Sequence, residues 1–257
     1  MIIQPEDKEI FLKTLNKKGF LLEDKVWKIL EGADFQNIER NITLNHNDER
    51  VEIDFLLING RHHLVGECKR TDYSWFFAKA SERSNTLNLI HQSQNKFQVK
   101  TRGTSDFKTA WTDLEVLFKD DGRLEITQQG FVKTSKNSEE NIHKAIKQVL
   151  KETEAYIYSR GLPNSIIIPI IVTNADLYYI DYSKGDIDSK GDLTNYDEIK
   201  KIKGLVYNFP EIIKYGVYKS LIQGISPGIL KHNVKSVFIV NVEHLKEFID
   251  LILEQDI

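Results

Sequence analysis

Apolar positions near the start of the chain repeat at helical spacing. Residues 5–16 form the first predicted helix, because Pro5 suits a first helical turn and Gly19 lies just beyond the end. Residues 20–31 form the second predicted helix, whose apolar stripe consists of Leu22, Val26, Ile29 and Leu30. The chain is therefore expected to open with two short helices.

The pattern changes at residue 50, where apolar residues begin to follow strand spacing. The sequence RVEIDFLLI at 50–58 predicts one strand, and HHLVGECK at 62–69 predicts its partner. Asn59-Gly60 lies between them and is a strong signal for a tight two-residue turn. The two strands are therefore expected to form an antiparallel hairpin.

The middle of the chain is more polar. Residues 76–100 are predicted to be helical, and the runs 113–118 and 123–132 are strand-like around the turn Asp121-Gly122. A long helix is predicted over 138–159, with Asn137 or Ser138 as its N-cap and acidic residues in its first turn.

The last third of the chain contains further strand and helix patterns. Strands are predicted at 165–174, 176–182 and 236–240, a polar loop at 183–204, and an amphipathic helix at 242–254. Pro169 predicts an edge or a bulge in the first of these strands, because proline cannot donate to a ladder.

This order of elements predicts an α/β fold with helices flanking a mixed central sheet. Residues 1–182 are expected to form the core, with an inserted helix and hairpin segment at about 71–137. Residues 183–257 are expected to form a C-terminal strand-helix extension, packed on the core or in a dimer interface.

The composition indicates the cellular compartment in which the protein is expected. The chain has 257 residues, of which 40% are hydrophobic and 28% charged, so a substantial core is expected. The longest apolar run, at 166–172, is too short to cross a bilayer, and no signal-peptide pattern is present. Cys68 alone cannot form an internal disulfide. We therefore expect a cytoplasmic protein without a membrane partner.

Charge is unevenly distributed, although the net charge is only −3. Residues 69–102 carry seven basic residues against two acidic ones, a local net charge of +5. The C-terminal residues 243–257 are acidic instead. The basic stretch is a candidate path for a nucleic-acid backbone. Its proposed contacts are Arg70, Lys79, Arg83, Lys96, Lys100 and Arg102.

The predicted hairpin carries the candidate catalytic residues. If Asn59 and Gly60 form the turn, Asp54 faces Val65, and Glu67 and Lys69 project from the same face. Glu67 is then diagonal to Asp54, a separation that one metal ion can bridge. Two carboxylates and an ammonium therefore converge.

Two nearby acids repel each other unless a positive charge lies between them. Lys69 is one such charge and a divalent ion is another; an all-oxygen ligand set favours Mg²⁺ or Mn²⁺. An ordinary surface salt bridge is the alternative explanation. Leu56, Ile58 and Val65 share the same predicted face, however, and an outer solvent face is rarely so apolar.

The order of these acids resembles the PD-(D/E)XK, or restriction-endonuclease-like, nuclease superfamily, and is most similar to its Mrr-like branch. The likeness rests on an early helical acid, Glu23, an Asp on a strand, Asp54, and Glu-x-Lys on the hairpin partner. It implies that Asp54 and Glu67 ligate magnesium, that Lys69 assists the attacking water, and that Glu23 helps to hold the metal's water. It also implies a restriction-endonuclease-like core.

The resemblance covers residues 18–70 well and 138–182 in pattern only. The proline of the superfamily name is absent, and Glu152 with Tyr156 is the nearest match to a Gln-x-x-x-Tyr pattern. The expected function is Mg²⁺-dependent DNA cleavage in restriction or antiphage defence, with a partner protein or a homodimer as possible assemblies. The alternatives are a catalytically silent nucleic-acid-binding or scaffold subunit, and a protein with a chance salt bridge.

Overall fold

The structure is a computed structural model of the 257-residue chain. It describes residues 5–16, 20–33, 35, 37–72, 74–79, 86–93, 96–103, 124–127, 141–160, 164–181, 185–190, 192–195, 200–210 and 234–254.

Two helices open the described part of the chain, and two long series of strands follow, separated by α4 (Asn141–Arg160). The helices are α1 (Pro5–Asn16), α2 (Phe20–Glu31), α4 (Asn141–Arg160), the one-turn η4 (Val242–His244) and α6 (Leu245–Glu254). The strands of the main sheet are β1 (Asn37–His46), β2 (Glu49–Asn59), β3 (His62–Lys69), β5 (Thr86–Ser93), β6 (Lys96–Gly103), β8 (Ile166–Thr173), β13 (Gly204–Pro210) and β14 (Val234–Asn241).

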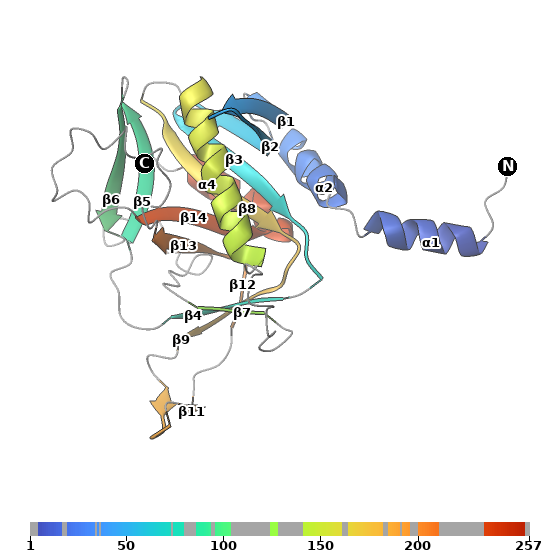
Figure 1. Ribbon diagram of the computed structural model, residues 1–257, viewed down its shortest axis with the longest axis vertical. Helices are drawn as coiled ribbons and strands as arrows, with labels where there is room; N and C mark the ends of the chain where they lie inside the picture. The colour runs from blue at the N-terminus through green and yellow to red at the C-terminus, as the bar shows by residue number, and fades with distance from the viewer. Residues whose placement is uncertain are drawn as a thin grey trace.

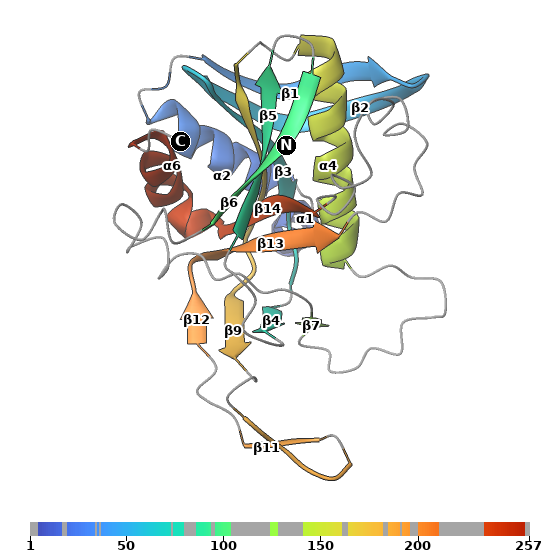
Figure 2. The ribbon, with the colours of Figure 1, turned by 90° about the vertical axis from the view of Figure 1, so that its left-hand side faces the viewer.

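The main sheet is mixed and has the order β1-β2-β3-β8-β14-β13, with the β5–β6 hairpin attached to β8. Strands β1 to β3 are antiparallel neighbours, whereas β3, β8 and β14 run parallel. Helices α2 and α6 cover one face and α4 covers the other (Figures 1 and 2). The predicted α/β class, a mixed sheet flanked by helices, is confirmed and is consistent with a restriction-endonuclease-like core.

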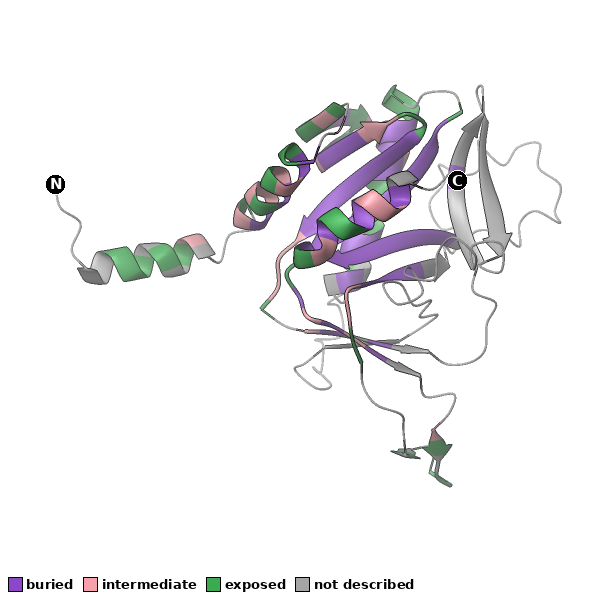
Figure 3. Cartoon of the chain, turned by 180° about the vertical axis from the view of Figure 1, so that it is seen from behind, coloured by how far each residue is buried: buried purple, intermediate pink, exposed green. Residues whose placement is uncertain are grey.

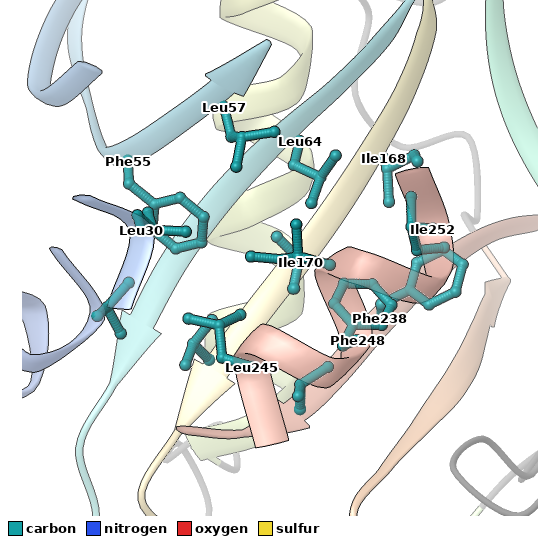
Figure 4. Close-up of a cluster of buried hydrophobic side chains, with 14 of the residues drawn as sticks. Leu30, Phe55, Leu57, Leu64, Ile168, Ile170, Phe238, Leu245, Phe248 and Ile252 are labelled. Atoms are coloured by element: carbon teal, nitrogen blue, oxygen red, sulfur yellow. The ribbon is translucent and has the colours of Figure 1, made fainter. Parts of the chain in front are cut away.

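Buried apolar side chains hold these layers together. Figure 3 shows that the central strands are buried along most of their length, while α1 extends away from the sheet. Between the sheet and helices α2 and α6, Leu30, Phe55, Phe238 and Phe248 pack into one cluster (Figure 4). Each such side chain contributes roughly 1.5–3 kcal/mol through burial, which fixes the position of α2 relative to β2 and β3.

The hairpin of β2 and β3 is confirmed, but its turn differs from the prediction. Asn59 pairs with His62, so Gly60 and Arg61 form the two-residue loop. Gly60 has a φ of 58°, a left-handed conformation that glycine adopts without strain. The register is shifted relative to the prediction, so Leu56, not Asp54, lies opposite Val65.

The predicted helix at 76–100 is wrong. The structure has β4 (Trp75–Lys79) followed by the hairpin of β5 and β6. Leu87 and Leu89 alternate with polar residues, a strand spacing hidden by the overall polarity of the segment. Tertiary pairing supports the strand, because β5 joins β8 and buries Ile90.

Two further features of the main sheet differ from the prediction. Strand β1 was not predicted, although Ile42 and Leu44 alternate in it and are buried. Pro169 lies in a central strand and not at an edge. Its missing N–H is tolerated because β8 changes partner there: Ile167 pairs with β5, and pairing with β14 begins at Ile170.

A second, four-stranded sheet has the order β12-β9-β4-β7 and contains β7 (Leu124–Thr127), β9 (Leu177–Asp181) and β12 (Lys200–Ile202). The predicted loop at 183–204 therefore contains strands, including the short pair β10 (Asp186–Ile187) and β11 (Leu193–Asn195). The run 113–118, the turn Asp121-Gly122 and the caps Asn137 and Ser138 lie outside the described residues.

The last predicted strand and helix are confirmed as β14 and α6. The apolar face of α6 is buried against the chain's own core through Leu245, Phe248, Ile249 and Ile252. A homodimer, which stays a prediction, would therefore need another surface.

Candidate active site

The two central acids lie on adjacent strands. The β2–β3 ladder ends with the pair Phe55 and Gly66, and Asp54 and Glu67 are the residues that adjoin this pair on the two strands. Their carboxyls are close enough for a hydrogen bond between them. The structure thus brings together the pair that the sequence singled out.

An irregularity in the β1–β2 ladder positions Asp54. Regular pairing stops between Arg40–Phe55 and Ile42–Ile53, and Asn41 lies at the break with a φ of 51°. On either side of this point, β2 residues that are two positions apart are buried on opposite faces of the sheet. Ile53 packs on the α4 side of the sheet, whereas Phe55 packs on the α2 side. Asp54 is the β2 residue at which this change of face occurs.

Each acid has a fixed hydrogen-bond donor. The backbone N–H of Cys68 donates to Oδ2 of Asp54 at 2.6 Å. The side-chain amide Nε2 of Gln148, on α4, donates to Oε2 of Glu67 at 2.8 Å. The second contact joins residues 81 positions apart, so α4 is part of the site. Sequence analysis did not identify Gln148 as a functional residue.

Glu152 brings a third carboxyl to the same place from the next turn of α4. Its side chain is 1% exposed, and its carboxyl lies against the Glu67 carboxyl and the Gln148 amide. Glu67 and Asp54 are the charges that act on it most strongly. The sequence showed Glu152 only as the nearest match, with Tyr156, to a Gln-x-x-x-Tyr pattern, because nothing local indicates that it faces two acids on other elements.

Lys69 and Glu23 border the acids. Lys69, the last residue of β3, is half-buried and lowers the pKa of both Asp54 and Glu67 through its positive charge. Glu23, on α2, is close enough to Asp54 for mutual repulsion and is partly neutralised by Arg40. The four acids and bases suggested by the sequence are therefore neighbours.

Burial and mutual repulsion dominate the electrostatics of the acids. Burial raises the pKa of Glu67 to about 8, and the Asp54 carboxyl adds to the rise while Lys69 opposes it. Burial also raises the pKa of Asp54, against the hydrogen bond from Cys68. The pKa of Glu152 is raised well above its usual value by burial and then by Glu67. Buried acids with strongly raised pKa values are common at functional sites.

The donor set is compatible with a hard divalent cation. Asp54, Glu67 and Glu152 offer only oxygen atoms, which favours Mg²⁺ or Mn²⁺ over softer metals. The Glu152 carboxyl is buried against two other acids, a repulsion that a cation at this place would offset. No group of three or more His, Cys, Asp or Glu side chains in the described residues is arranged to hold an ion as it stands. Mg²⁺ is often held by one or two carboxylates with water and substrate phosphate completing its shell.

Neighbouring polar residues have structural roles. His63 and Tyr156 are buried and joined by a hydrogen bond of 2.8 Å between Nδ1 and the hydroxyl. This contact ties α4 to β3 one turn beyond Glu152. Cys68 is buried in the α2-facing cluster, as expected for a small core residue.

The predicted nucleic-acid contacts lie on several elements. Arg70 follows β3 and pairs with Asp72, with 3.4 Å between Nη2 and Oδ1. Lys79 ends β4, in the second sheet, and Arg83 lies outside the described residues. Lys96, Lys100 and Arg102 occupy alternate positions of β6. Their hairpin joins β8 at Ile166 and Ile167, at the opposite end of that strand from the residues paired with Glu67 and Lys69.

Comparison with known proteins gives one match. A family model described as NERD, a nuclease-related domain, matches residues 18–121, a range that includes Glu23, Asp54, Glu67 and Lys69. The match supports a nuclease of the PD-(D/E)XK-like superfamily at a coarse level. No curated protein and no solved structure matches the chain. No helix in the described part of the chain is long and apolar enough to cross a membrane.

Proposed function

We propose that the chain is a divalent-metal-dependent endonuclease that hydrolyses phosphodiester bonds of DNA. The observation that carries the proposal is the convergence of Asp54 and Glu67, joined by a hydrogen bond, beside the ammonium of Lys69. The nuclease-related match over the same residues supports the reaction class.

In this proposal Asp54 and Glu67 hold Mg²⁺ or Mn²⁺. When bound, the ion supplies Lewis-acid stabilisation of charge that develops on the phosphate. The Cys68 N–H and the Gln148 amide fix one oxygen of each acid, which limits the orientations that each carboxylate can adopt. A preorganised pair of this kind loses little entropy when it binds an ion.

Lys69 acts on the reacting atoms. Its ammonium extends from the strand that carries Glu67, where it stabilises negative charge on the phosphate and orients the attacking water. Glu23 borders the same space from α2 and helps to hold the water of the ion. The alternate basic positions of β6, with Arg70 after β3, are the proposed contacts to the nucleic-acid backbone.

A role in restriction or antiphage defence and membership of the Mrr-like branch are proposals from the sequence resemblance. The same holds for a partner protein of a defence system and for a homodimer.

The test is a cleavage assay with duplex, single-stranded and junction DNA, and with RNA, in Mg²⁺ or Mn²⁺ and with a chelator. Wild-type protein should cut DNA only with the ion, and Asp54→Asn should lose both cleavage and Mn²⁺ binding. Lys69→Ala should still bind Mn²⁺ and DNA but cut on the order of a hundredfold more slowly, as when one transition-state interaction is removed. Full cleavage in excess chelator, or by Lys69→Ala, would overturn the assignment.

A further inference from the structure

The proposed reaction leaves the buried carboxyl of Glu152 without a role. Its side chain is 1% exposed, its polar neighbours are the Glu67 carboxyl and the Gln148 amide, and no positively charged group among the described residues compensates it. Burial of an uncompensated polar group destabilises a fold, and an apolar residue of similar size would avoid that cost. This buried acid is therefore expected to gain a positive partner in another state of the protein.

The neighbours of Glu152 along α4 fix the direction in which it points. One turn earlier, Gln148 donates to Glu67 at 2.8 Å; one turn later, the Tyr156 hydroxyl and His63 Nδ1 are 2.8 Å apart. Both contacts are made with β3. Residues four apart lie on the same side of a helix, so Glu152 also faces β3, between these two contacts.

The charges that reach Glu152 are negative. Glu67 acts on it most strongly and Asp54 next, both by repulsion. The amide of Gln148 donates to Glu67 and also to Glu152, but it is neutral and leaves the repulsion between the acids uncompensated. A cation at Asp54 and Glu67 would turn this repulsion into attraction without any movement of the backbone.

We propose that Glu152 is a third carboxylate of the divalent-ion site and that ion binding draws its side chain toward Glu67. This inference rests on the proposed function, because it requires an ion at Asp54 and Glu67. The same three acids do not form a ready-made ligand group in the described structure, so the side chain of Glu152 changes rotamer on binding. Gln148 keeps one oxygen of Glu67 occupied and leaves the other for the ion.

The test is Glu152→Gln, which preserves shape and removes the charge. Mn²⁺ binding is measured by calorimetry on the full chain, together with the Mn²⁺-induced rise in melting temperature. The variant should bind Mn²⁺ about tenfold to a hundredfold more weakly, the range seen for residues that support metal sites. Without the ion it should be at least as stable as the wild type, since the amide replaces an uncompensated acid.

The matched control is Glu154→Gln, two residues further along the same helix, where the carboxylate lies 3.6 Å from His46. It should bind Mn²⁺ like the wild type. Glu152→Asp, which keeps the charge on a shorter side chain, should bind more tightly than Glu152→Gln.

The outcomes separate this inference from the proposed function. If Asp54→Asn abolishes Mn²⁺ binding but Glu152→Gln binds like the wild type, the role of Glu152 is refuted and the metal site stands. If wild-type protein binds no Mn²⁺, both fail. If Glu152→Gln is less stable without the ion and Glu152→Asp does not recover affinity, the residue is structural and the inference is overturned.

Discussion

Gly66 is the position where one added methyl group should disturb both central acids. It lies between Val65 and Glu67 on β3 and pairs with Phe55, the neighbour of Asp54. The ring of Phe55 covers it so closely that a Cβ on Gly66 would lie 2.0 Å from Cζ and 2.1 Å from Cε1. Ordinary van der Waals contact begins at 3.4 Å, so the ring has to withdraw.

The expected cost of Gly66→Ala follows from where the ring would go. Phe55 is 2% exposed and packs with Leu30 and the helix-facing cluster, so the ring has no open space to enter. Overpacking of a filled core costs about 1–3 kcal/mol, and complete loss of a buried phenyl ring costs about 3–5 kcal/mol. We expect Gly66→Ala to lower the free energy of unfolding by about 2–3 kcal/mol, near the upper end of the first range.

Urea denaturation of Gly66→Ala, Phe55→Leu and the double variant measures this effect. If the ring is the obstacle, the smaller leucine makes room for the methyl group, and the double variant is more stable than the sum of the single changes predicts. Mn²⁺ affinity should fall in Gly66→Ala, because Asp54 and Glu67 flank the displaced pair. A loss below about 0.5 kcal/mol, or strict additivity, would refute the reasoning.

Three other perturbations test separate features. The pKa of Glu67 is raised to about 8 in the fold, so the ion-free protein binds this proton more tightly than the unfolded chain does. The contribution of Glu67 to stability is therefore fully present below its unfolded pKa of 4.5 and is lost as pH rises through about 8. Denaturation at about pH 5 and about pH 9 should show this slope, and saturating Mn²⁺ should reduce or reverse it. An upward slope without Mn²⁺ would contradict the prediction. Asn41→Val should lower the free energy of unfolding by about 1–2 kcal/mol and weaken Mn²⁺ binding, because a β-branched residue resists the left-handed backbone. Asn41→Gly should retain the stability and the Mn²⁺ affinity of the wild type. Equal effects of the two changes on Mn²⁺ binding would be inconsistent with a backbone role. Lys96→Glu and Lys100→Glu should weaken DNA binding. The slope of log affinity against log salt concentration should fall by roughly one unit for each phosphate that is no longer neutralised. An unchanged slope would place these residues away from DNA.

The sequence by itself determined the local part of the site. Alternating apolar residues and the Asn59-Gly60 signal defined the β2–β3 hairpin, and period-two geometry placed Glu67 and Lys69 on one face. These are near-neighbour relationships, set by strand spacing and turn chemistry. Even so, the turn lies one residue later than predicted, a shift that places Leu56 and not Asp54 opposite Val65.

Polar surface strands were harder to predict. The β5–β6 segment alternates, but its polarity favoured a helix, and pairing with β8 decided the outcome. The prediction from Pro169 was also wrong. It indicated an edge, yet the change of partner along β8 permits a proline in the centre of the sheet. Both results depend on strands that are distant in the sequence.

Only the tertiary structure decided what surrounds the acids. Gln148 and Glu152 reach Glu67 because α4 packs across the sheet, and Asp54 lies at the change of face beside the break at Asn41. Side-chain spacing within one element follows from backbone geometry and can be read from the sequence. The meeting of side chains from separate elements depends on how the apolar faces pack, and each such face fits several partners until the complete core selects one.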